Sequence, residues 1–299
     1  HKEIAIDLET RDPNLLTMGS GSVRGDGEVI GIAVAVEGWS GYFPINHEGG
    51  GNMDRALTLD WFEEVLHTPA TKIFHNAMYD VSWIRSLGFQ INGGIVDTLI
   101  AASLINENRW GYSLNALGKE YVGMGKNEKI LNEAAKDWGV DPKSEMWRLP
   151  APLVGEYAEQ DAIVTLKLWH ALQHEISKQD LWDVFNMETN LFPCLVDMKF
   201  KGVRVDINKA EALKKQLTVT EKDMHRDIKK LAGFDVEIWA AASIAKAFDK
   251  EKIPYDRTEK GAPSFTKNFL ATHPAELPKL INEAREINKA NTTFIETIL

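Results

Sequence analysis

The sequence contains a single cysteine, Cys194, among 299 residues. One cysteine excludes an internal disulfide and a cysteine metal cluster, and it fits a reducing compartment such as the cytoplasm. Cys194 lies in the apolar run 191–196, which predicts a buried thiol with a structural role. No signal peptide is visible at the start, so none is expected, and the absence of an apolar run of about 18 residues predicts that no segment spans a membrane.

The sequence also has no excess of positive charge. The formal net charge is −10, and residues 1–180 carry 15 basic and 26 acidic side chains against 19 and 18 in residues 181–299. The first part is therefore not a general basic DNA-binding surface, although metal ions can adapt an acidic site to nucleic acid. Lysines and arginines gather within 209–231, where they either grip a nucleic-acid backbone or form a solvated face.

The chain length fits two domains of roughly 150 residues each. Alternation of apolar and polar residues predicts strands at 4–10, 29–36 and 39–45, which suggest a meander. Helical spacing and capping residues predict helices at 57–66, 77–87, 98–105, 113–121, 128–138, 152–178, 181–201, 209–231 and 240–250, with a last one from 278. A further short strand is expected at 202–206. This order indicates an α/β domain, a boundary near residue 180, and a mainly helical part.

Several polar residues at the ends of these elements are interpreted as local structure. Ser113, Asp206 and Ser264 are predicted helix caps, and Asp97 is a predicted cap with no chemical role. The run HEGGGN at 47–52 lacks the Lys-Ser/Thr ending of a phosphate-binding loop, so it is interpreted as a surface turn.

The first predicted strand carries two acidic residues. Asp7 and Glu9 are two residues apart, so their side chains point to the same side of a strand. Two neighbouring carboxylates repel each other, and burying them unpaired is costly. Either a hard cation such as Mg²⁺ or Mn²⁺ lies between them, or the strand has a solvated acidic edge.

Four further side chains lie at the start of a second element or on a third. Asn76 follows a short strand and can cap the next helix, which places Asp80 near a helix start at a strand end. Asp80 either serves a site there or complements the helix dipole. Tyr157 and Asp161 share one face of a late helix, where the alternative is a half-buried tyrosine beside a solvated acid.

Together the patterns D-x-E, N-x-x-x-D and Y-x-x-x-D place four carboxylates on three elements. Four carboxylates can converge on two metal ions that act on a phosphodiester. In this order the motifs resemble the tyrosine-bearing branch of the DEDD 3′→5′ exonucleases over residues 1–180. The likeness is greatest to the proofreading domain of family A DNA polymerases and rests on Ile6-Asp7-Leu8-Glu9-Thr10, His75-Asn76-Ala77-Met78-Tyr79-Asp80 and Tyr157-Ala158-Glu159-Gln160-Asp161.

Residues 181–299 resemble, more loosely, the start of a family A polymerase domain of phage type. Residues 188–206 are similar to its entering segment, and 244–248, 257–265 and 285–294 are similar to its thumb. The chain ends before the palm and fingers motifs of that family, so we expect a piece of a larger or split polymerase. Polymerisation by this chain alone is not expected.

The resemblance implies an RNase H-like (DnaQ-like) exonuclease domain at 1–180 followed by a partial thumb at 181–299. It implies that Asp7, Glu9, Asp80 and Asp161 hold two divalent cations, Mg²⁺ or Mn²⁺, and that Tyr157 orients the attacking water. Asn76 and Thr10 are the expected substrate-binding residues. The expected substrate is a single-stranded or frayed DNA 3′ end in the cytoplasm, that of the bacterial host if the protein is phage-encoded.

Two alternatives remain at this point. An RNA-trimming exonuclease of the RNase D type carries the same acids, although the thumb-like segment argues against it. A nucleic-acid-binding scaffold without catalysis is the other alternative, and the presence of all four acids and the tyrosine argues against that.

Overall fold

The computed structural model describes residues 1–125 and 127–299, which form two compact units, residues 1–202 and 203–299. The first unit is α/β and the second is mainly helical, which confirms the predicted fold class. In the described part of the chain, no helix combines the length and the apolar character that crossing a membrane requires.

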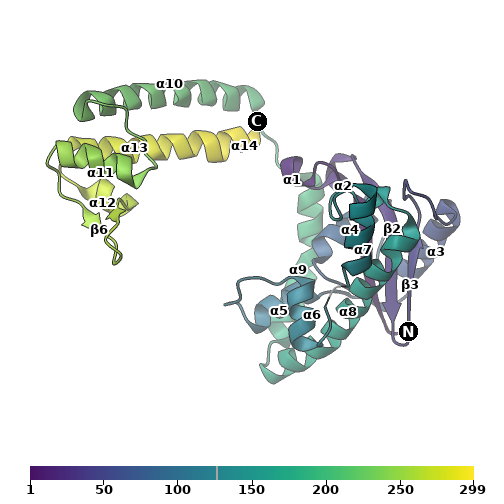
Figure 1. The fold of residues 1–299 in the computed structure, drawn as a ribbon. Helices are drawn as coiled ribbons and strands as arrows, with labels where there is room; N and C mark the ends of the chain where they lie inside the picture. Colours follow the sequence, from purple (N-terminus) through teal and green to yellow (C-terminus); the bar gives the residue numbers. More distant parts are fainter. Residues whose placement is uncertain (126) are drawn as a thin grey trace. The chain divides into compact units, whose positions relative to one another are not determined.

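A mixed five-stranded sheet with the strand order β3-β2-β1-β4-β5 forms the centre of the first unit (Figure 1). Strands β1, β2 and β3 are antiparallel neighbours, which confirms the predicted meander, and β4 and β5 run parallel to β1. The strands are β1 (Glu3–Arg11), β2 (Glu28–Val36), β3 (Trp39–Pro44), β4 (Thr71–Phe74) and β5 (Ile95–Asp97).

Helices pack on both faces of this sheet. The helices of this unit are α1 (Leu15–Met18), α2 (Gly21–Arg24), α3 (Arg55–His67), α4 (Ala77–Ser86), α5 (Thr98–Ile105), α6 (Leu114–Tyr121), α7 (Lys129–Trp138), the 3-10 turn η1 (Met146–Arg148), α8 (Ala151–Lys178) and α9 (Trp182–Lys201). The two short helices α1 and α2 lie in the segment between β1 and β2, for which no helix is predicted from the sequence.

Helix α8 covers the face of the sheet to which Ala5 of β1 belongs. Ala5 shares a core with Ala33 and Ala35 of β2 and with Ala158 and Ala162 of α8. Small side chains on both surfaces let the helix approach the sheet closely. Successive side chains of a strand alternate between its two faces. Asp7 and Glu9 are two and four residues after Ala5, so they also face α8.

The opposite face packs against α3, α4 and α9. Ile6 and Phe62 belong to this second core together with Phe192 and Val196 of α9, while Phe185 of α9 belongs to the α8 core. Helix α9 is therefore part of the first compact unit, which ends at residue 202, whereas the sequence placed the boundary near 180. The assignment of functions to the two parts stays a prediction.

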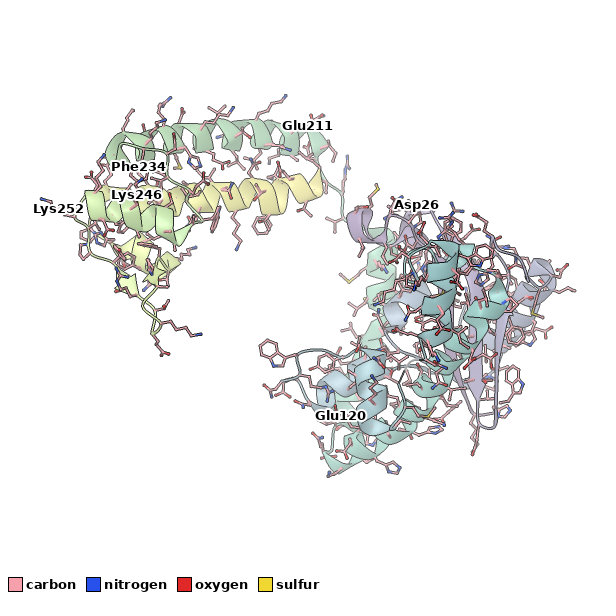
Figure 2. All side chains as sticks on the ribbon, viewed as in Figure 1. Asp26, Glu120, Glu211, Phe234, Lys246 and Lys252 are labelled. Carbon is pink, nitrogen blue, oxygen red and sulfur yellow. The ribbon has the colours of Figure 1, made fainter. Side chains whose placement is uncertain are left out.

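The second unit is a helical assembly with one small hairpin. Its elements are α10 (Ile207–Ala232), α11 (Ala241–Lys250), β6 (Asp256–Arg257), β7 (Pro263–Ser264), α12 (Lys267–Thr272), α13 (Glu276–Lys289), the π-helix η2 (Ala290–Ile295) and α14 (Glu296–Ile298). Helices α10 and α13 lie side by side over a core that contains Ile228, Phe248 and Ile281 (Figure 1). Beside this core, Lys246 Nζ lies 4.8 Å from the centre of the Phe234 ring (Figure 2).

Basic side chains of α10 are partly neutralised within the second unit. Four of them form ion pairs with acids: Lys214 with Glu296, Arg226 with Asp223, Lys229 with Asp235 and Lys230 with Asp227. Whether this helix binds a nucleic-acid backbone stays a prediction.

Three local predictions are wrong. Cys194 is exposed, because Phe192 and Val196, four residues apart, take the buried side of α9 and turn Cys194 outward. Residues 202–206 form no strand, and all five are exposed without a neighbouring strand. Ser264 lies in β7, and Thr266 caps α12 instead by accepting a hydrogen bond from the Phe269 amide at 3.2 Å.

Predicted caps at three other helix starts are confirmed. Ser113 accepts a hydrogen bond from the Ala116 amide, Asp206 from the Lys209 amide and Asp97 from the Leu99 amide. These bonds satisfy main-chain donors that have no partner within the helix.

Candidate active site

Asp7 and Glu9 lie on the central strand β1, both partly buried. The pairing of β1 with β2 shifts register between Glu9 and Thr10, so a β-bulge interrupts the ladder there. Bulges re-aim side chains and often occur beside active sites. The irregularity falls at the end of the predicted first motif, and pairing with β2 resumes at Thr10 and Arg11.

Asp80 reaches β1 from the first turns of α4. Strand β4 pairs with β1 only at Glu3, Ile4 and Ala5, and beyond this point the Asp80 Oδ1 atom accepts a hydrogen bond from the Leu8 amide at 2.9 Å. Asp80 is only 3% exposed, and burial raises the pKa of its carboxyl well above the usual value, with the charge of Asp7 as the second cause. The structure therefore brings Asp80 into the electrostatic range of Asp7.

The start of α4 is held by Asp97 rather than by Asn76. Asn76 adopts a left-handed backbone conformation with φ 66°, and its side chain makes no capping hydrogen bond, so the prediction that it caps α4 is wrong. The Asp97 carboxylate accepts hydrogen bonds from the Asn76 and Ala77 amides at 2.9 and 2.8 Å. Asp97 thus caps α5 and also anchors the helix start that carries Asp80.

Tyr157 and Asp161 come from α8, one helical turn apart. Burial raises the pKa of the Tyr157 hydroxyl far above its usual value, and the charges of Glu9, Asp161 and Asp7 raise it further. A hydrogen bond between the Tyr157 hydroxyl and the Asp161 carboxylate acts in the same direction. The phenol is therefore protonated at neutral pH and donates to Asp161, and the acids of β1 are close enough to influence it.

A cleft of about 540 Å³ opens over these residues. Three of the predicted site residues, Glu9, Thr10 and Tyr157, line it, whereas Asp80 and Asp161 are buried. Asp7 and Asn76 are not among the described residues of the lining. The lining also contains Tyr79, Ser113, Asn115, Glu128, Leu131, Asn132, Pro142, Lys143 and Met146.

Some of these lining residues were not predicted from the sequence. Tyr79 precedes Asp80, and its hydroxyl lies 2.6 Å from the Thr10 hydroxyl, so it fixes one wall of the cleft. Its position next to a motif acid was the available signal. Asn132 and Lys143 come from a polar segment with no motif, so only the fold could bring them to the cleft.

Carboxylate oxygens are the ligands that Mg²⁺ and Mn²⁺ prefer, and four such side chains on three elements suit these ions. A cation beside Asp80 and Asp7 would also reverse the charge effect that raises the pKa of Asp80. Within residues 1–125 and 127–299, however, no group of three or more His, Cys, Asp or Glu side chains is arranged to hold a metal ion. The donors are chemically suitable, and the complete ligand set stays a prediction.

Comparison with known proteins bears on these observations. The DNA-directed DNA polymerase of Pseudomonas phage M6 is 34% identical over 310 residues, which cover 99% of this chain and 46% of that protein. DNA polymerase DpoZ of Acinetobacter phage SH-Ab 15497 is 31% identical, over 79% of this chain and 40% of that protein. The chain thus spans less than half the length of these curated relatives.

A solved structure described as the POL domain of Pol1 from M. smegmatis in complex with DNA primer-template and dNTP has a similar fold. Its TM-score is 0.70 at 16% identity, and the match covers 98% of this chain and 46% of that one. At this identity the likeness shows the fold alone, and it agrees with the expected RNase H-like domain followed by a helical segment.

A sequence family described as 3′-5′ exonuclease, that of family A DNA polymerases, matches residues 1–177. This match covers the three motifs that carry Asp7, Asp80 and Tyr157, and it confirms the resemblance seen in the sequence. The chain belongs to the 3′-5′ exonuclease family of family A DNA polymerases.

Proposed function

We propose that this chain is a divalent-metal-dependent 3′→5′ exodeoxyribonuclease that removes 5′ nucleotides from a single-stranded or frayed DNA 3′ end. The observation that carries the proposal is the approach of Glu9, Asp161 and Asp7 to Tyr157, and of Asp80 to Asp7, beside the cleft that Glu9 and Tyr157 line. Four carboxylates gathered beside one cleft suit hydrolysis of a phosphodiester by bound metal ions.

Each acid has a place in this proposal. Asp7, Glu9 and Asp161 would hold one cation, and Asp7 with Asp80 would hold a second. Cations held there would lower the pKa of a water molecule and would neutralise the charge that develops on the scissile phosphate. The protein fixes the geometry, because Asp80 is tied to β1 through the Leu8 amide and Asp161 is anchored in the buried face of α8.

Tyr157 acts as a positioning group for the attacking water. Its raised pKa keeps the phenol protonated, so it cannot serve as a general base at neutral pH. The hydroxyl donates a hydrogen bond to Asp161, and the lone pairs of the phenol oxygen can accept a hydrogen bond from water. Asp161 thereby fixes the direction from which Tyr157 receives the water.

Names of the relatives support DNA as the substrate class. The phage proteins are DNA polymerases, and the solved neighbour is described with a DNA primer-template. Thr10 lines the cleft and is the proposed substrate contact there, and Asn76 is proposed as a second contact, at the start of α4.

We further propose that the chain is the proofreading part of a longer DNA polymerase that acts in the cytoplasm of a bacterial host. The proposal rests on the curated relatives, which extend well beyond the span that matches this chain. The palm and fingers of such a polymerase would be its partner, and residues 203–299 would be the start of the thumb.

Degradation of 5′-labelled single-stranded DNA tests the proposal, with Mg²⁺, with Mn²⁺ and with EDTA. We expect a metal-dependent ladder that shortens from the 3′ end, loss of more than about 99% of the rate in Asp7→Asn, and full activity in Asp60→Asn. Asp60 is exposed on α3, so its variant changes the charge equally but outside the cleft. Faster degradation of an RNA strand of equal length would instead favour an RNase D-type enzyme, and degradation by Asp7→Asn at the normal rate would refute the site.

A further inference from the structure

A buried hydrogen-bonded chain lies beside the proposed site and links β3 to the start of α8. The Tyr42 hydroxyl of β3 lies 2.6 Å from Nε2 of His47, and His47 Nδ1 lies 3.0 Å from the Leu149 carbonyl oxygen. His47 is only 3% exposed, although it belongs to the HEGGGN run interpreted from the sequence as a surface turn. Leu149 is fully buried two residues before α8 begins.

The partners of His47 fix its protonation state. A carbonyl oxygen can only accept a hydrogen bond. Nδ1 of His47 therefore carries a hydrogen atom and donates a hydrogen bond to the Leu149 carbonyl oxygen. Burial lowers the pKa of His47, which favours the neutral imidazole at neutral pH. In the neutral ring Nε2 is the acceptor, so the Tyr42 hydroxyl donates to it and the chain has one direction from Tyr42 to Leu149.

Tyr42 extends across β2 toward the acids of β1. A Cβ atom on Gly31 would lie 2.0 Å from the Tyr42 hydroxyl oxygen, so only glycine leaves room for the ring at this place. Gly31 is the direct partner of Glu9 in the β1–β2 ladder. The charges of Glu9 and Asp7 raise the pKa of Tyr42 beyond the effect of burial, in agreement with this placement.

The loop around His47 is bound closely to the segment that enters α8. The Glu48 amide donates to the Trp147 carbonyl at 2.9 Å, and the Ala151 amide donates to the Gly50 carbonyl at 3.0 Å. With the bond from His47 to Leu149, three hydrogen bonds join residues 47–50 to residues 147–151. The first turn of α8 is therefore fixed against β3 and its loop.

We propose that the Tyr42–His47 pair is a positioning element of the nuclease site that sets the place of α8, and with it Tyr157 and Asp161, against Glu9 on β1. The inference rests on the proposed nuclease function. Tyr42 packs against both the core under α8 and the smaller core around Leu149, and its ring lies within 3.5 Å of the position of a Cβ on Gly155. Neither residue of the pair has to touch the substrate.

Four variants in the intact chain test the proposal through the degradation rate of single-stranded DNA. Tyr42→Phe and His47→Leu should each lower kcat by about tenfold to 100-fold while KM changes less than about twofold, because a small misplacement of reacting groups is costly. His47→Gln retains a donor and an acceptor and should keep kcat within about threefold. Tyr42→Phe combined with His47→Leu should lose no more than the single variants, because both break the same chain.

Phe62→Leu is the control for lost stability. Phe62 is fully buried on the opposite face of the sheet, so this variant should lower Tm without changing kcat. Hydrogen exchange of residues 151–161 gives a readout independent of activity, and exchange there should rise in Tyr42→Phe and His47→Leu but not in His47→Gln or Phe62→Leu.

The result that overturns the proposal is a kcat of Tyr42→Phe and His47→Leu within about twofold of the unmodified chain, or a double variant that loses the product of the single losses. If the unmodified chain degrades no DNA with either metal, the proposed function fails by itself. The exchange of residues 151–161 then decides the positioning role alone.

Discussion

Asp80 combines deep burial with a negative neighbour. Its pKa is raised by burial and by the charge of Asp7. The protonated carboxyl therefore stabilises the folded state at pH values below the usual pKa of Asp, and this stabilisation is lost as pH rises through the folded-state pKa. At pH 7, above the usual pKa of Asp, keeping this carboxyl buried beside Asp7 therefore costs stability. Asp80→Asn keeps the oxygen that accepts from the Leu8 amide and removes this charge.

We accordingly expect Asp80→Asn to raise Tm at pH 7 in EDTA by at least about 2–4 °C, the effect of roughly 1 kcal/mol in a domain of this size. Added Mg²⁺ should raise the Tm of the unmodified chain more than that of the variant. Asp97→Asn is the matched control, because Asp97 uses both oxygens to accept amide hydrogen bonds and its replacement should lower Tm. A drop in Tm for Asp80→Asn would indicate that the charge is structurally compensated.

At the residue scale, the elements that carry the motif residues could be predicted from the sequence, whereas the surroundings of single residues without a motif could not. The places of Asp7 and Glu9 on β1 and of Tyr157 and Asp161 on α8 could be predicted because strand and helix periods put them on defined faces. His47 could not, because a histidine in a Gly-rich run looks like an exposed turn until the contacts with residues 147–151 are known.

At the element scale, the Gly-rich loop after β3 shows how closely α8 is held. A Cβ on Gly49 would lie 2.4 Å from the Pro150 nitrogen and 2.6 Å from the Leu149 carbonyl carbon. These are main-chain atoms, so the start of α8 has to move. We expect Gly49→Ala to lower kcat on single-stranded DNA by about tenfold or more, because Tyr157 and Asp161 shift with the helix.

Gly50→Ala provides the comparison within the same loop. Gly50 has φ 85° and no atom within 4 Å of its Cβ position, so alanine there adds backbone strain of about 1–2 kcal/mol without a clash. We expect a lower Tm and a normal kcat. Equal kcat values for the two alanine variants would argue against a fixed position of α8.

Long periodic elements were predicted well and short ones were not. The meander and the helices α8, α9 and α10 follow from patterns repeated over many residues. Strand β5 has three residues and depends on pairing with β4, so its sequence alone gives no clear period. The expected strand at 202–206 fails for the converse reason, since a suitable sequence found no partner strand.

At the scale of the whole molecule, the break near residue 180 marks a change of helix rather than the end of a compact unit. The sequence around Gln179 and Asp180 does interrupt the helical pattern, and Asp180 adopts a positive φ of 56°. The packing of α9 nevertheless continues the first unit, through Phe185 in one core and Phe192 and Val196 in the other. Only tertiary contacts could reveal this.

A truncation series tests where the first unit ends. Residues 1–202 contain both cores complete, so this fragment should unfold in one cooperative transition and degrade single-stranded DNA in a metal-dependent manner. Residues 1–180 lose three buried side chains of α9, each worth about 1.5–3 kcal/mol of burial, a sum comparable with the whole stability of many domains. We expect the shorter fragment to be partly unfolded or to aggregate.

The triple variant Phe185→Ala/Phe192→Ala/Val196→Ala in residues 1–202 separates packing from chain length. If packing of α9 completes the unit, this variant should behave like residues 1–180 in thermal unfolding and in hydrogen exchange. The loss of protection from exchange should be greatest in the elements that α9 contacts, which are α4, α5 and β5. If residues 1–180 instead unfold cooperatively at the same temperature as residues 1–202, α9 only rests on the surface. The domain boundary then lies where the sequence placed it, and the catalytic unit is smaller than the compact one.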